Sequence, residues 1–175
     1  MASYIVDFQA FKGLVNEFYL KEVAIVNIHS DTVYHWIIRP PTIYCNLNEE
    51  MQLRVNYLTY KIHGIPWQTG YIDESEVIAL MKNILKNAAI VYIKGSERVT
   101  YLKNLLKGYR NVTVYDLDHI EEFLKPECKK KNLKFKCTYD RPSHKKLRCA
   151  LEQATRYRDI LRKGFYAVYT AHAHN

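Results

Sequence analysis

The first 40 residues contain three short runs that are rich in β-branched and aromatic side chains. These runs cover residues 3–9, 21–28 and 33–39, and turn-prone residues separate them. They predict three antiparallel strands. Pro40-Pro41 ends the third strand, because proline cannot donate a hydrogen bond to a neighbouring strand. The opening therefore restricts the chain to folds whose sheet begins with antiparallel pairing.

The pattern changes after residue 72. Apolar residues recur at helical spacing to about residue 85, with Asp73 as the expected N-cap and Glu76 three residues later. A strand-length apolar run at 88–93, a helical segment at 99–106, a strand at 111–115 and a brief helix at 117–124 follow. This alternation predicts right-handed β-α-β crossovers. With a possible short helix within 46–60 and a last helix over 146–163, we expect one mixed α/β domain over residues 1–170 and a disordered tail over 171–175.

Composition and charge exclude some classes of protein and favour one kind of binding partner. The chain has 175 residues, 48% of them hydrophobic and 25% charged, which suits a globular domain and excludes a disordered chain. No apolar run approaches the roughly 20 residues of a membrane span, and the first residues lack a signal-peptide pattern, so we expect an intracellular protein. The 26 Lys and Arg against 18 Asp and Glu give a net charge of +8, which favours anionic partners.

Basic residues are concentrated in the segment 125–148, which contains ten Lys or Arg and only two acids, Glu127 and Asp140. Two further cations, Lys94 and Arg98, follow the strand 88–93 at the start of a helix, where backbone N–H groups attract anions. The sequence predicts that these positions contact phosphates, although a solvated charged surface is the alternative. The candidate nucleic-acid-binding residues are Lys94, Arg98, Lys129, Lys130, Lys131, Lys134, Lys136, Lys145, Lys146 and Arg148.

The order of elements is that of the ribonuclease H-like fold of DEDD exonucleases, and the opening Tyr4-Ile-Val-Asp7-Phe-Gln9 resembles their Asp-x-Glu strand. The resemblance makes Asp7 the first acid and puts Gln9, which cannot supply a negative oxygen, in place of the second. It places Lys94, Gly95 and Arg98 where this family presents Asn and Asp. Arg148 and Gln153 stand where its general-base His and last acid stand. The resemblance therefore implies a degenerate nuclease with only a vestigial Asp7.

A closer resemblance is to the nuclease-like domain of Maelstrom, a piRNA-pathway protein with a zinc-binding Glu-Cys-His-Cys set. It implies a structural zinc held by Glu22, Cys137, His144 and Cys149, with Cys128 or Asp140 as substitutes for His144. The chain also resembles a group of insect and mobile-element proteins. The shared patterns are Phe-x-x-Lys-Glu at 18–22, His-Gly-x-x-Trp at 63–67 and Val-Tyr-x-Lys-Gly at 91–95.

We therefore expect a catalytically degenerate domain that binds RNA or single-stranded nucleic acid and carries a structural zinc. Two alternatives stay open: a single-strand-specific ribonuclease that works without two metal ions, and a protein-interaction scaffold. Cys149 beside His144 could also form an activated thiolate, and the four cysteines could be plain thiols rather than ligands. The sequence has no Gly-rich P-loop or dinucleotide fingerprint, which argues against nucleotide hydrolysis and redox catalysis.

Overall fold

The computed structural model describes residues 2–13, 18–120, 139 and 147–172, and its centre is a five-stranded mixed sheet. The strands are β1 (Ala2–Lys12), β2 (Phe18–Asn27), β3 (Val33–Ile37), β4 (Ala88–Ile93) and β5 (Thr113–Asp116). Their order is β3-β2-β1-β4-β5, with β1, β2 and β3 antiparallel and β4 and β5 parallel to β1. This order confirms the expected ribonuclease H-like fold class.

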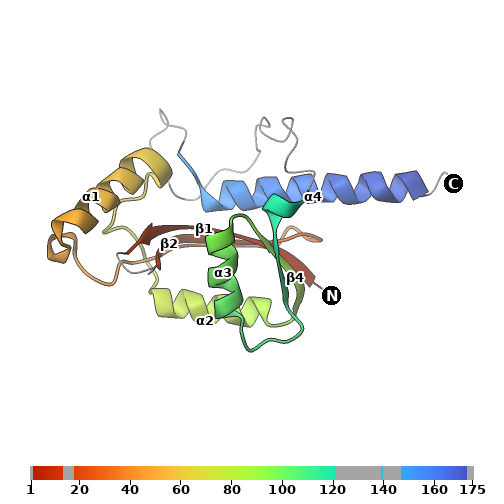
Figure 1. The fold of residues 1–175 in the computed structure, drawn as a ribbon, viewed down its shortest axis with the longest axis horizontal. Coiled ribbons are helices and arrows are strands. Elements are labelled where there is room, and N and C mark those ends of the chain that lie inside the picture. Colours follow the sequence, from red (N-terminus) through yellow and green to blue (C-terminus); the bar gives the residue numbers. More distant parts are fainter. Residues whose placement is uncertain (1, 14–17, 121–138, 140–146, 173–175) are drawn as a thin grey trace.

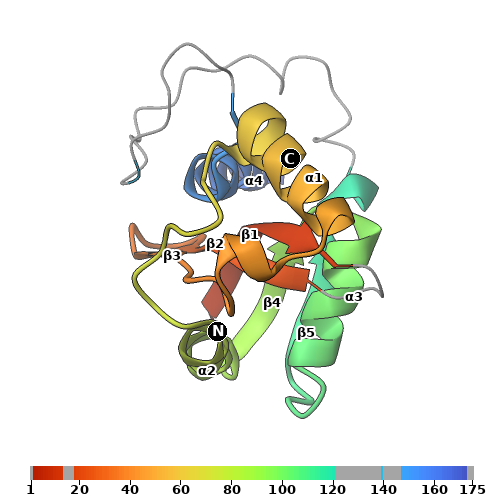
Figure 2. The ribbon, with the colours of Figure 1, turned by 90° about the vertical axis from the view of Figure 1, so that its left-hand side faces the viewer.

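Helices cover both faces of the sheet (Figure 1). They are α1 (Glu49–Leu58), which continues into a π-helical turn (Thr59–His63), α2 (Glu74–Leu85), α3 (Ser96–Leu105) and α4 (Ala150–His172). Short 3-10 turns span Tyr44–Asn46 and Leu117–His119. Figure 2 looks along the sheet and shows α4 and α1 on one side of it and α2 and α3 on the other.

The last helix differs from the sequence expectation at both ends. It begins at Ala150 rather than near 146, and it continues to His172 rather than ending near 163. The expectation of a disordered tail over 171–175 stays a prediction. Residues 165–172 contain no Pro or Gly to interrupt the backbone hydrogen bonds, so the helix propagates through them. Residues 173–175 lie outside the described part of the chain.

Alternation along the strands gives the sheet two different faces. Val6 and Phe8 of β1 face α2 and α3 and join a large apolar core, whereas Ile5 packs with residues of α4. Asp7 alternates with Val6 and Phe8, so it lies on the α4 face of the sheet. The polar side chain of Asp7, on the central strand β1, therefore faces α4.

Polar contacts fix α4 at two points. At its start, Glu22 Oε2 accepts a hydrogen bond of 2.9 Å from the backbone N–H of Ala150. Further along, Arg162 donates to the carbonyl oxygens of Ile28 (2.6 Å) and Ser30 (2.9 Å) at the β2–β3 turn. A carboxylate at a helix N-terminus is favourable because the first N–H groups have no partner within the helix. These contacts set the position of α4 across β1 and β2.

Lys21 of the Lys-Glu pattern contacts the segment that carries the His-Gly-x-x-Trp pattern. The buried Nζ of Lys21 donates to the carbonyl oxygens of Ile38 (3.0 Å), Trp67 (2.6 Å) and Thr69. Burial lowers the pKa of Lys21 to about 7, but only the ammonium form has the three N–H donors that three carbonyls require. Lys21 therefore holds the segment after the π-helical turn against β2, which is a structural role.

The start of α2 also differs in detail from the expectation. Asp73 occupies the N-cap position, but its side chain makes no capping hydrogen bond. Its carboxylate instead lies 3.2 Å from Arg39, and Glu74 accepts a hydrogen bond from the backbone N–H of Leu20. The acids of this first turn tie α2 to the sheet rather than capping the helix.

Candidate functional site

Four polar side chains lie beneath α4, on one face of the first three strands. They are Asp7 and Gln9 of β1, Glu22 of β2 and His35 of β3, and they share a face because Gln9 pairs with Glu22 while Asp7 and His35 both pair with Ala24. Asp7, Gln9 and Glu22 are almost completely buried, at 1%, 3% and 0% exposure. The register of β1 shifts directly after Gln9, and such bulges often occur next to functional sites.

The carboxylate of Asp7 forms an ion pair with Arg98 from the first turn of α3. Nη1 of Arg98 contacts Oδ1 of Asp7, and the guanidinium carbon lies 5.2 Å from the ring centre of Phe8. Oδ2 of Asp7 has no hydrogen-bond partner within the described part of the chain. Burial raises the pKa of Asp7 to about 7, although the charge of Arg98 acts in the opposite direction.

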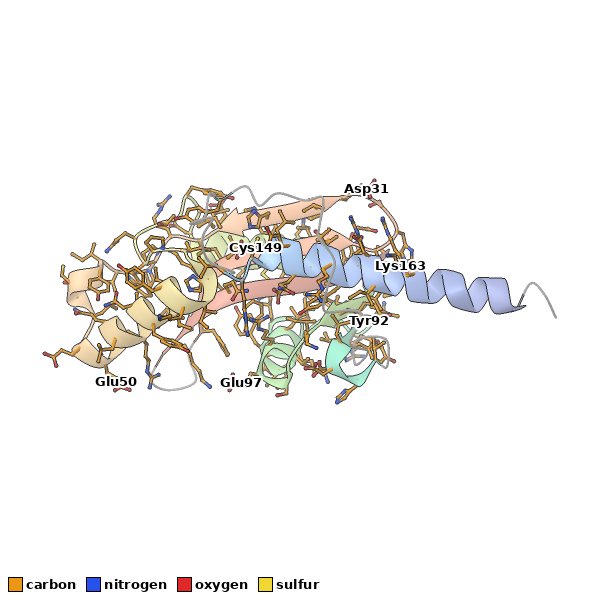
Figure 3. All side chains as sticks on the ribbon, turned by 90° about the horizontal axis from the view of Figure 1, so that it is seen from above. Asp31, Glu50, Tyr92, Glu97, Cys149 and Lys163 are labelled. Atoms are coloured by element: carbon orange, nitrogen blue, oxygen red, sulfur yellow. The ribbon has the colours of Figure 1, made fainter. Side chains whose placement is uncertain are left out.

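The second carboxylate, Glu22, is the centre of a separate cluster. Its Oε1 lies 2.8 Å from Nε2 of His35 and accepts a hydrogen bond of 3.5 Å from the thiol of Cys149, while Oε2 caps Ala150. Figure 3 views the molecule from the α4 side and labels Cys149 at the beginning of that helix. Among residues 2–13, 18–120, 139 and 147–172, no three His, Cys, Asp or Glu form a group that could hold a metal ion.

Acidic side chains from the end of β5 and the turn that follows it contact the turn between β4 and α3. The backbone N–H of Gly95 donates to Oδ1 of Asp116 (3.1 Å), and Nζ of Lys94 lies 2.5 Å from Oδ1 of Asp118. Gly95 has a φ of 101°, which other residues rarely adopt. The positive groups expected to bind a phosphate here are therefore matched by carboxylates of the chain itself.

Two further features border this face. The phenol of Tyr157 on α4 is packed near Asp7 and Arg98, and burial, with a smaller effect from Asp7, raises the pKa of Tyr157 to about 12. Tyr115 of β5 is 51% exposed and stacks on Tyr92 with ring centres 6.1 Å apart. An exposed ring beside the carboxyl ends of β4 and β5 can stack on a nucleic-acid base.

The structure brings some of the predicted site residues together. Glu22 and Cys149 are in contact, Lys94 and Arg98 are in ion pairs, and Arg148 is exposed next to Cys149 with its backbone N–H donating to Ile62. The other predicted residues lie outside the described part of the chain, namely Cys137, His144, Lys129, Lys130, Lys131, Lys134, Lys136, Lys145 and Lys146, with Cys128 and Asp140. The roles of all these residues stay predictions.

Sequence reasoning missed two contacts, Asp7 with Arg98 and Glu22 with His35. Asp7 and Arg98 are 91 residues apart, and nothing local in the sequence reveals their pairing. His35 had a usable signal, since the period of two along β3 places it on the face that carries Glu22.

Comparisons with known proteins find similarity among solved structures. No model of a known protein family matches the sequence, and no curated protein matches it. Among solved structures, the manganese-containing exonuclease domain of Mopeia virus resembles the chain with a TM-score of 0.45 and 18% identity. The match covers 69% of this chain and 54% of the viral domain, so it extends over about half of that domain. The strand order of the sheet, rather than this match, defines the fold class.

The raised pKa of Asp7 predicts a particular dependence of stability on pH. Because the folded state binds this proton more tightly than the unfolded state, whose pKa is near 3.8, protonation favours folding. The free energy of unfolding should therefore fall as the pH rises from about 4 to about 7, by up to about 1.4 kcal/mol for each pH unit. Urea unfolding across this range should show the fall in the wild-type chain and a flatter profile in Asp7→Asn.

Asp118→Asn serves as the control, because this carboxylate is 46% exposed and lies in the same part of the fold. Its profile should parallel that of the wild-type chain. Equal profiles for wild type and Asp7→Asn would contradict the assignment of this pH dependence to Asp7.

Proposed function

We propose that this domain binds nucleic acid, and RNA in particular, without two-metal hydrolysis. The observation that carries the proposal is the buried ion pair of Asp7 with Arg98. In the resemblance to DEDD exonucleases, Asp7 is the first acid of the metal site, and here a guanidinium neutralises it. Gln9, in place of the second acid, adds no charge.

The charge requirement of two-metal catalysis supports this reading. Two divalent ions bring about four positive charges, which several carboxylates must offset. Among the described residues of this face the carboxylates are Asp7, which is paired with Arg98, and Glu22. Two carboxylates, one of them already paired, are too few to offset two divalent ions, whereas binding needs only cations and exposed rings.

We further propose a structural zinc at the Glu22 cluster, held by Glu22 and Cys149 together with Cys137 and His144. The contact between the Glu22 carboxylate and the Cys149 thiol supports it, because these donors suit zinc and both are buried. Such an ion would tie the basic segment 125–148 to the sheet. Its contribution is structural, since four protein ligands leave no open position for chemistry.

The RNA proposal predicts a steep dependence of binding on salt. The test measures, by fluorescence anisotropy, how a fluorescein-labelled, single-stranded 20-mer of uridine binds the protein. Binding should weaken as salt rises, because Lys and Arg side chains release the counterions of the phosphates and added salt makes this release less favourable. The variant Lys129→Gln/Lys130→Gln/Lys131→Gln should lower the slope of log K against log salt by about 0.7 for each lost contact, or about 2 in all.

The matched control is Lys12→Gln/Arg39→Gln/Arg54→Gln. It removes three cations that already form exposed ion pairs, with Glu97, Asp73 and Glu50 respectively. This variant loses the same net charge but should keep the wild-type slope. Binding that ignores salt would contradict the proposal and favour a protein scaffold, and RNA cleavage that persists in chelator would favour a metal-independent ribonuclease.

The zinc proposal predicts a fixed metal content. Elemental analysis of protein purified without chelator should find about one zinc per chain in the wild type, as expected for a single closed site. Cys149→Ser should lose it, because a hydroxyl replaces the thiolate ligand. Cys45→Ser changes an exposed cysteine and should retain the metal. Wild-type protein without zinc, or zinc content unaffected by Cys149→Ser, would contradict this site.

A further inference from the structure

Two segments of the chain carry five cations and no acid. The segments are 81–87, at the end of α2, and 102–113, at the end of α3 and in the loop to β5. We call the five residues the basic edge, and they are Lys82, Lys86, Lys103, Lys107 and Arg110.

Topology brings the two segments together. They directly precede β4 and β5, and these strands are parallel neighbours, so both segments lie at the amino ends of the strands. Leu85 of the first segment and Leu106 and Tyr109 of the second belong to the same apolar core. Figures 1 and 2 show both helices on the face of the sheet opposite α4.

The cations of the basic edge are available to a ligand. Lys86, Lys103, Lys107 and Arg110 are exposed, and Lys82 is half-buried. Within the ranges that the structure describes, none of the five takes part in an ion pair or a side-chain hydrogen bond. This differs from the candidate site, where Asp118 and Asp7 match Lys94 and Arg98.

The basic edge is also separate from the candidate site. The six residues of β4 lie between them, a distance of about 20 Å at 3.3 Å per residue. In a stacked strand of nucleic acid this corresponds to about six nucleotides at 3.4 Å each, and in a fully extended strand to fewer. One nucleic-acid chain can therefore reach both regions.

We propose that the basic edge is a second binding surface for the phosphate backbone of the nucleic acid bound at the candidate site. This inference rests on the proposed function. A nucleic acid fits better than a membrane because membrane-surface helices insert apolar side chains. The large exposed apolar residues of the described chain lie elsewhere, at Ile43, Leu53, Tyr57, Tyr60, Tyr71 and Tyr115.

The test compares Lys86→Gln/Lys103→Gln/Lys107→Gln with wild type in the same RNA-binding titration. If the three lysines contact phosphates, the salt slope should fall by about 2, at about 0.7 per contact. The loss of affinity should be large for a 20-mer and much smaller for a 3-mer, which is too short to reach from the candidate site to the basic edge. Melting curves of the variant and the wild type should coincide.

The control is Lys12→Gln/Arg39→Gln/Arg54→Gln, which loses the same charge from ion-paired positions and should bind as the wild type does. A wild-type slope in the basic-edge variant, with RNA binding intact, would overturn this inference and leave the proposed function standing. Absence of RNA binding by the wild type would overturn both. Binding of the wild type to vesicles of anionic phospholipid, lost in the basic-edge variant while RNA binding is unchanged, would assign the surface to membranes instead.

Discussion

Two carboxylates buried under one helix constrain the rest of this structure. A buried charge is tolerated only where nearby groups compensate it, and Asp7 and Glu22 meet this requirement with different partners. Arg98 compensates Asp7 and so ties α3 to the central strand. Glu22 compensates the N–H groups at the start of α4 and so sets where that helix crosses the sheet. This face of the sheet is thus stabilised by contacts within the protein.

This internal compensation changes where a polyanion can bind. The cations that follow β4, Lys94 and Arg98, have their charge matched by acids, which reduces their attraction for phosphate. Binding then depends on cations without such partners. Among the described residues, the exposed cations of the basic edge are such candidates.

The order of strands and helices along the chain followed from the sequence because strand-like runs and helical runs alternate clearly, and Pro40-Pro41 marks where the antiparallel part ends. The extent of α4 was harder, since Gly164 is a residue typical of a helix end, yet the helix continues through it to His172. In the site, the family resemblance brought Glu22 and Cys149 forward as a pair, and they are in contact. The pairing of Asp7 with Arg98 could not be predicted, because contacts between distant segments depend on how helices pack on the finished sheet.

We propose that Asp7, paired with Arg98, does not serve a metal site, and that the domain holds RNA without cutting it. The most direct measurement incubates the protein with end-labelled single-stranded RNA in manganese and separates bound from free and intact from shortened strands. The account predicts RNA that is retained by the protein and keeps its full length. Shortened products that disappear with chelator and in Asp7→Ala would show a working metal nuclease and contradict it.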